Sequence, residues 1–223
     1  MKNFTLIIPA KDESESLPVL LKELQNIDCK KIVVLTNNDL NTQKAIENFK
    51  DIEILFQKRG GYGRAIIEGI NHTDTEYCCI INADGSMDPK YLNQMLEKCY
   101  QNDLVFASRY DSPNGGSDDD TFVTYIGNKI FSFLGNVIFK LNISDILYTY
   151  IFGKTKSFKD LELNYDDFRL CIEIPIKAKK RNFKYITIPS YERSRIGGKK
   201  KVNAIKDGLL ILIGMLSFIG KKG

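Results

Sequence analysis

The sequence is poor in the residues that build metal clusters and disulfide frameworks. It has one histidine, His72, and its five cysteines include no C-x-x-C pair. This scarcity excludes a zinc ribbon, which needs several cysteine or histidine ligands at fixed spacing. It also indicates reduced thiols in a cytosolic setting rather than a network of disulfides.

Features of two other protein classes are also missing. The first predicted strand is not followed by a G-x-G-x-x-G motif, so the glycine turn that is diagnostic of a dinucleotide-binding fold is absent there. The apolar run between Asp207 and Lys221 is shorter than the ~20 residues that a membrane-spanning helix needs. The short apolar stretch near the start runs at once into charged residues, so we expect no signal peptide and a cytoplasmic location.

Charge is divided unevenly along the chain. From Pro175 to the last residue there are thirteen Lys and Arg against Glu192 and Asp207, although the whole chain carries only +4. A basic section beside an acidic body predicts an anionic partner, such as phosphate groups or an anionic membrane face. A solvated lysine-rich surface is the alternative. We expect no nucleic-acid binding, because the basic residues are not interleaved with aromatic residues in a recognised module.

Short β-favouring segments alternate with helical patterns through the first half of the chain. We predict strands at residues 4–9, 31–35, 52–57, 77–81 and 104–108, and helices at residues 17–27, 65–70 and 91–99. Such alternation predicts an α/β fold, with a mostly parallel central sheet flanked by helices.

The pattern changes after residue 108. A polar loop at 111–120 carries an acidic run that fits a solvated linker as well as a site. We predict helices at 122–141 and 168–180, the second of them interrupted or started at Pro175, and a strand at 184–189.

An apolar helix is predicted at the C-terminal end, at residues 202–223. Two interpretations of this helix stay open. It lies in the membrane interface with its lysines on lipid phosphates, which would place the protein peripherally at the inner face of the cell membrane. Alternatively, it packs against the body of the protein or against a second subunit in a homo-oligomer.

Oxygen-bearing side chains follow the fourth predicted strand. Asn82, Asp84 and Ser86 alternate in the loop that leaves the apolar run ending at Ile81. Ligands of open α/β sheets bind at the carboxyl ends of the strands. Carboxylate, amide and hydroxyl oxygens suit a hard cation such as Mg²⁺ or Mn²⁺. An ordinary turn uses the same residue types, so the loop alone leaves both interpretations open.

Five stretches taken together point to a family. They are, in chain order, IIPAKDESESL, KRGGYGRAIIEGI, INADGSMDP, ASRY and IPSYERSRIGGKKKVNAIKDGLLIL. With these motifs the sequence resembles the family 2 glycosyltransferases, and especially their dolichol-phosphate mannose synthase-like branch. The resemblance implies a GT-A nucleotide-diphospho-sugar transferase fold and inverting, metal-dependent transfer of a hexose from a nucleotide-sugar donor. The acceptor would be a polyprenyl phosphate or a glycan of the cell envelope.

The resemblance also divides the chain and assigns its donor-binding residues. Residues 1–201 would form the transferase domain, with a nucleotide-sugar-binding half at 1–110 and an acceptor-side half at 111–201. Residues of three motifs would bind the donor: Pro9, Ala10, Glu13, Gly63, Arg64, Asn82, Asp84 and Lys199. Asp84, Asn82 and Ser86 would hold the metal and, through it, the diphosphate. The glycine-rich stretch is also consistent with a plain helix start, whose N-terminus attracts anions.

Further motif positions imply catalytic roles. Arg109 is placed where a guanidinium would bind phosphate, although arginines also cap strand ends. Arg195 lies in a loop that would close over the diphosphate. Asp145 and Glu173 match acidic positions that could act as general base if the acceptor is a hydroxyl, or could be structural caps or partners of a lysine.

The sequence departs from the family pattern in two places. Leu35 and Thr36 stand where the second strand usually ends in acidic residues, and Asn82 stands where the metal loop usually begins with aspartate. An amide oxygen is still a metal ligand but brings no negative charge. A catalytically silent nucleotide-sugar-binding or scaffold protein is therefore a second hypothesis.

Overall fold

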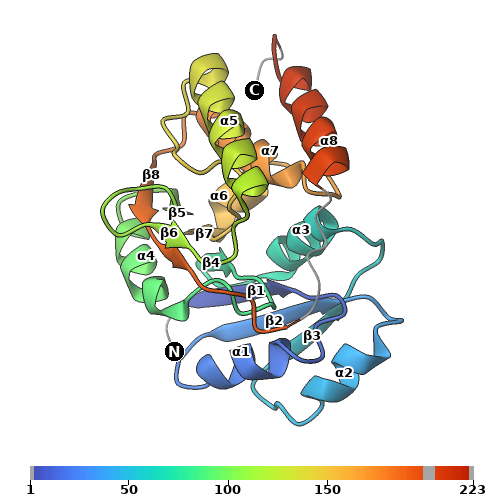
Figure 1. Cartoon of the computed structure of the whole chain (residues 1–223). Coiled ribbons are helices and arrows are strands. Elements are labelled where there is room, and N and C mark those ends of the chain that lie inside the picture. The colour runs from blue at the N-terminus through green and yellow to red at the C-terminus, as the bar shows by residue number, and fades with distance from the viewer. Residues whose placement is uncertain (1–2, 198–203, 221–223) are drawn as a thin grey trace.

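A seven-stranded sheet forms the centre of the molecule. The computed structural model describes residues 3–197 and 204–220, and its main sheet has the order β3-β2-β1-β4-β7-β5-β8 (Figure 1). The strands are β1 Phe4–Pro9, β2 Lys30–Leu35, β3 Glu53–Phe56, β4 Tyr77–Ile80, β5 Leu104–Ser108, β7 Ile151–Lys154 and β8 Tyr185–Pro189. A small second sheet pairs β6 Gly116–Ser117 with β9 Tyr191–Glu192.

Helices cover both faces of the main sheet. They are α1 Leu17–Glu23, α2 Leu40–Ile46, α3 Tyr62–His72, the 3₁₀ helix η1 Pro89–Tyr91, α4 Leu92–Cys99, α5 Phe122–Phe139, α6 Thr155–Asp160, α7 Leu170–Lys180 and α8 Ala204–Ser217. Alternate strand residues point to opposite faces, so Leu6 and Ile8 join one buried cluster with α1, α2 and α4. Ile7 between them joins the other cluster, with α3, α6, α7 and α8.

The predicted α/β architecture is confirmed. Each of the five strands predicted in the first half is present, and each of their ends lies within one residue of the predicted position. Four strand pairs of the main sheet are parallel, namely β1 with β2, β1 with β4, β2 with β3, and β5 with β8. The carboxyl ends of β1 and β4 therefore meet at one edge of the sheet, where a ligand site is expected.

Four elements of the main sheet and its helices differ from the sequence prediction. Strand β7 was not predicted, and it runs antiparallel to both β4 and β5. Helix α7 is not interrupted or started at Pro175, because it runs unbroken from Leu170 to Lys180 with a buried apolar face on both sides of the proline. The short helices α2 and α6 were also missed, since one or two turns give little periodicity to read.

The second half of the chain completes the sheet of the first. Strand β7 lies between β4 and β5, and β8 forms one edge beside β5. The described residues of the two predicted halves, 3–110 and 111–197, therefore share one sheet and both cores.

The five cysteines lie inside the protein. All of them are free thiols and buried. Burial raises the pKa of Cys78 to about 12, so at neutral pH this thiol is protonated and poorly nucleophilic.

Replacement of Phe152 by Ala should lower the free energy of unfolding by about 3–5 kcal/mol, measured by urea denaturation. Phe152 in β7 is fully buried and its ring packs against Phe4 with centroids 5.2 Å apart. The same substitution at Phe133, which is 66% exposed on α5, is the matched control and should change stability by no more than ~0.5 kcal/mol. Equal losses in the two variants would contradict the packing described here.

Candidate active site

A cleft of about 500 Å³ opens at the carboxyl ends of β1 and β4. Its walls come from the loops after β1, β4 and β5, from the start of α3, from the 119–128 region and from the segment after β8. Predicted site residues in the lining are Pro9, Ala10, Glu13, Asn82, Asp84, Ser86, Arg109 and Arg195. Most residues assigned from the motifs therefore come together in one place.

The exit of β1 is held in shape by α2. Asp12 has a positive φ of 52°, and its N–H donates to Oδ2 of Asp39, the N-cap residue of α2, at 2.7 Å. The N–H of Glu13 donates to Oγ1 of Thr42 at 2.9 Å. Ser16 Oγ donates to the buried Glu13 carboxylate at 2.5 Å. Glu13 therefore lines the cleft as a fixed carboxylate rather than as a mobile side chain.

The loop after β4 presents oxygen atoms to the cleft. Asp84 Oδ1 accepts from the N–H and the Oγ of Ser86, at 3.1 and 2.9 Å. Asn82 Oδ1 accepts from the hydroxyl of Tyr62 at 2.7 Å. Gly85 has φ 76°, and a Cβ there would lie 2.3 Å from the side chain of Ile196. The turn therefore needs glycine, and Asp84 is oriented by its own loop.

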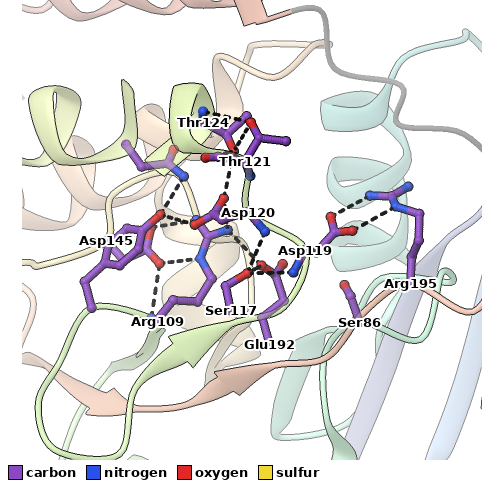
Figure 2. A network of polar contacts seen from close by, with 12 residues as sticks. Ser86, Arg109, Ser117, Asp119, Asp120, Thr121, Thr124, Asp145, Glu192 and Arg195 are labelled. Carbon is purple, nitrogen blue, oxygen red and sulfur yellow. Dashed lines mark hydrogen bonds and ion pairs between the residues drawn. The ribbon is translucent and has the colours of Figure 1, made fainter. Parts of the chain in front are cut away.

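The segment 192–196 is fastened to this loop by main-chain hydrogen bonds. The N–H of Arg193 donates to the carbonyl of Ser86, and the N–H of Ile196 to the carbonyl of Asp84, both at 2.9 Å. The side chain of Arg195 then lies 3.0 Å from the carboxylate of Asp119 (Figure 2). It also lies 3.6 Å from the carboxylate of Asp84. A guanidinium is thereby held beside the candidate metal ligands.

Arg109 is buried in a cluster of carboxylates. Its Nε and one terminal nitrogen donate to both oxygens of Asp145, at 2.7 and 2.9 Å. Its other terminal nitrogen donates to Glu192 at 3.1 Å and lies 3.6 Å from Asp120 (Figure 2). Burial acts to lower the pKa of Arg109, but Asp145 and Glu192 outweigh burial and raise the pKa well above its ordinary value. This arginine is permanently charged.

The structure changes the interpretation of the two predicted bases. Asp145 is 1% exposed, does not line the cleft, and has both oxygens bonded to Arg109. Glu173 is also 1% exposed and lies outside the lining, where it accepts from the N–H groups of Asn164 and Tyr165 and pairs with Lys177 at 2.7 Å. Both carboxylates serve structure: Asp145 positions Arg109, and Glu173 ties a loop to α7.

The glycine-rich stretch also has a structural role. A Cβ on Gly63 would lie 2.3 Å from the carbonyl oxygen of Tyr165, so the glycine lets the 165–167 loop pack on α3. The Arg64 guanidinium pairs with Asp166 at 2.5 Å. Neither Gly63 nor Arg64 lines the cleft, whereas Gly60, Gly61, Tyr62 and Ala65 do. The motif therefore contributes to the cleft through Gly60, Gly61, Tyr62 and Ala65, and its contact with a donor stays a prediction.

Four carboxylates of the lining were not among the predicted site residues, namely Asp12 at the exit of β1 and three from later segments. Asp119 and Asp120 come from the acidic run whose role the sequence left open, and Glu192 follows the predicted strand β8. Burial raises the pKa of Glu192 above its ordinary value, although Arg109 opposes this. The acidic run at 118–120 was the sequence signal for Asp119 and Asp120. No local pattern in the sequence indicates that the side chain of Glu192 points into the cleft.

The candidate cation ligands are oxygen atoms from two segments. Among the described residues there is no group of three or more His, Cys, Asp or Glu side chains that could hold a metal ion by themselves. Asp84, Asn82, Ser86 and Asp119 supply two carboxylates, an amide and a hydroxyl. This set suits Mg²⁺ or Mn²⁺, which commonly take one or two carboxylates and complete their shell with water and substrate phosphates. Lys199, also predicted to bind the donor, lies outside the described residues.

Solved structures of a glucosyl-3-phosphoglycerate synthase share this fold. The glucosyl-3-phosphoglycerate synthase of Mycobacterium tuberculosis, solved with Mn²⁺, UDP and glucosyl-3-phosphoglycerate, superposes with a TM-score of 0.74 over 98% of this chain and 80% of that one, at 12% identity. The same enzyme with Mn²⁺, UDP-glucose and phosphoglyceric acid gives 0.73 over 97% and 79%, also at 12% identity. At this identity the likeness concerns the fold.

Sequence comparison agrees with the fold. Proteins named as uncharacterised glycosyltransferases from Mycobacterium tuberculosis and Mycobacterium bovis are 24% identical over 210 residues, which cover 94% of this chain and 94% of theirs. The family Glycosyl transferase family 2 matches residues 5–162. Because that match spans well over half of the 223 residues, the chain belongs to glycosyl transferase family 2.

Proposed function

We propose that the protein transfers a sugar from a nucleoside diphosphate sugar to an acceptor by direct displacement with inversion at the anomeric carbon. The observation that carries this proposal is the juxtaposition of Asp84 and Arg195 in the cleft at the carboxyl ends of β1 and β4. A divalent cation beside Asp84 and the guanidinium of Arg195 would offset the negative charge that builds on the departing diphosphate.

The donor half of the cleft is proposed to bind the nucleotide. Pro9, Ala10 and Glu13 line it at the exit of β1, close to the oxygen-bearing loop at 82–86. UDP is the first nucleotide to test, because UDP and UDP-glucose are bound in the glucosyl-3-phosphoglycerate synthase structures. Thr36 also lines the cleft, in a place where the family usually has an acidic residue. The nucleobase that the cleft prefers therefore has to be measured by comparing different nucleotides.

Asp84 is proposed as the principal metal ligand, with Asn82, Ser86 and Asp119 beside it. Mn²⁺ or Mg²⁺ is present with UDP in the synthase structures. When bound, such an ion acts as a Lewis acid on the diphosphate oxygens. Tyr62 and the Ser86 main chain hold Asn82 and Asp84 in place, so the protein provides a preformed set of oxygen ligands.

A polyprenyl phosphate is proposed as the acceptor, as in the dolichol-phosphate mannose synthase-like branch. Two features support it. The acceptor side of the cleft is lined partly by apolar side chains, Leu147, Phe168 and Ile211. The section from Pro175 onward is strongly basic, which suits a phosphate. A phosphate oxygen is already anionic and needs no base to attack the anomeric carbon.

A glycan hydroxyl is the alternative acceptor, and Glu192 is the proposed base for it. Among the described lining residues, Glu192 is a buried carboxylate whose pKa is raised by that burial. A base of this kind takes the proton of the hydroxyl as the new glycosidic bond forms and the bond to the diphosphate breaks. Asp145 acts through Arg109 in either case and is proposed as a positioning residue.

One observation favours a second candidate function, binding without catalysis. The amide of Asn82 brings no charge to the metal loop, and its oxygen already accepts from Tyr62. A cation would then depend chiefly on Asp84 and Asp119. Donor hydrolysis assayed with Mn²⁺ separates the two functions, since a silent protein would bind the nucleotide with no turnover in any acceptor mixture.

The Asp84→Ala variant should lose the thermal stabilisation that UDP and Mn²⁺ give together. At ~100-fold saturation the wild type should gain about 2.7 kcal/mol, which corresponds to roughly 5–10 °C in a domain of this size. Sugar transfer should fall at least ~100-fold, as expected for losing several kcal/mol of transition-state stabilisation.

Asp74→Ala is the matched control for this variant. Asp74 is an exposed carboxylate that precedes β4, at the end of the strand away from the cleft, and it pairs with Lys30. Its replacement should leave both the nucleotide shift and the transfer rate unchanged. An Asp84→Ala protein stabilised as strongly as the wild type would refute the proposed donor site.

The Glu192→Gln variant tests the nature of the acceptor. With a hydroxyl acceptor, transfer should fall ~100-fold or more, since general-base catalysis contributes 10²–10⁴-fold. The wild-type rate should then decline on the acid side with an apparent pKa above the ordinary value of a glutamate, because burial raises the pKa of Glu192 and the base must be deprotonated. With a polyprenyl phosphate acceptor, the variant should keep most of its activity. A wild-type acid limb at or below the ordinary glutamate pKa would exclude Glu192 as the base.

A further inference from the structure

The outer faces of α5 and α8 are strongly apolar. Among the described residues, twenty large apolar side chains are exposed, and thirteen of them lie on α5, on α8 or just after α8. On α5 they are Phe122, Val123, Tyr125, Ile126, Ile130, Phe133, Val137 and Ile138; the others are Ile205, Leu209, Ile213, Leu216 and Ile219. A contiguous apolar surface on a water-soluble domain marks a place of interaction.

The two helices lie side by side and project from the same end of the molecule (Figure 1). Ile211 and Met215 of α8 are buried, whereas Leu209 and Ile213 face outward and are 60% and 52% exposed. α8 packs against both α5 and α7. The exposed side chains of α5 and α8 therefore form one surface, which we call the α5–α8 face.

Polar side chains attach α5 to the body along its length. Asn128 donates to the Tyr110 hydroxyl at 2.8 Å, and Ser132 Oγ accepts from the N–H of Ile146 at 3.1 Å. One turn further, the Asn136 amide donates to the carbonyl of Ile143 and accepts from its N–H, at 2.9 and 3.0 Å. Within the described residues α5 is the one helix long and apolar enough to cross a membrane. However, these hydrogen bonds hold one side of α5 against the protein, so only its other side could face lipid.

Charge decides what covers the α5–α8 face. Helix α5 contains Lys129 and no acidic residue. In the sequence, Lys199, Lys200 and Lys201 precede α8, and Lys221 and Lys222 follow it. Lysines beside an apolar helical surface suit lipid phosphates, each basic residue near an anionic membrane contributing to binding. The same charges on a second copy of this chain would oppose close approach.

We propose that the α5–α8 face docks onto an anionic lipid membrane. The two helices lie in the interface, with their exposed apolar side chains among the acyl chains. The chain does not span the bilayer in this arrangement. This docking holds whether or not the cleft transfers sugar.

The same helices form part of the cleft. Thr124 and Asn128 of α5 and Ile211 of α8 line it. Docking of the α5–α8 face therefore brings the acceptor side of the cleft to the lipid surface. If the proposed sugar transfer holds, this placement names the acceptor class: a molecule anchored in the membrane by an apolar group.

Co-sedimentation of the full chain with lipid vesicles tests the docking. The wild type should bind vesicles of phosphatidylcholine containing phosphatidylglycerol at least ~10-fold more tightly than vesicles of phosphatidylcholine alone, and added salt should reduce this difference. The double variant Phe133→Asp with Leu209→Asp should lose binding to both. Circular dichroism and the UDP–Mn²⁺ thermal shift of the variant report whether its fold and its donor site are intact.

Leu40→Asp is the matched control, since Leu40 is 68% exposed on α2 and α2 lies at the opposite end of the molecule from α5 and α8 (Figure 1). It should bind vesicles like the wild type. Unchanged binding by the Phe133 and Leu209 double variant would overturn the proposal. A wild type that is dimeric by light scattering, becomes monomeric in the double variant and ignores vesicles would also overturn it, in favour of a second copy. If the protein binds vesicles but UDP and Mn²⁺ cause no thermal shift, the membrane docking stands and the proposed function is refuted.

Discussion

The buried guanidinium of Arg109 is the interaction on which the cleft depends. It follows β5 and joins Asp145 before β7, Asp120 before α5 and Glu192 in β9. Four segments far apart in the chain are thus fixed around one charge. Removing a single partner of such a buried group commonly costs about 3–5 kcal/mol, because the remaining charge is left uncompensated. Arg109 therefore organises the wall of the cleft that these segments form.

A second constraint shapes the part of the cleft beside the loop after β4. The main chain of the segment after β8 forms hydrogen bonds with the main chain of the loop after β4. These backbone bonds, rather than side-chain contacts alone, fix the position of Arg195. Carboxylates and a cation are held facing one another across a short distance. The lining of the cleft thus combines charged groups of both signs with the apolar side chains of Leu147, Phe168 and Ile211.

Much of the fold and part of the site could be predicted from local patterns. The first five predicted strands are short β-favouring segments bounded by turn residues. Segments with helical spacing of apolar residues lie between most of them, so the sequence predicts alternating strands and helices. The oxygen-bearing loop was found for the same reason: Asn82, Asp84 and Ser86 stand directly after a buried strand. Gly63 and Arg64 were less well predicted, because a glycine at a helix start looks the same whether it faces a ligand or, as here, the 165–167 loop.

By itself the sequence determined the parallel half of the sheet, the family motifs and the loop of candidate metal ligands, since each depends on residues close together in the chain. Tertiary structure decided the rest. Strand β7 lies antiparallel between β4 and β5. Asp145 and Glu173 lie outside the cleft lining, whereas Asp119, Asp120 and Glu192 lie within it. These outcomes rest on pairings between residues tens of positions apart, and such long-range contacts leave no periodic trace in the local sequence.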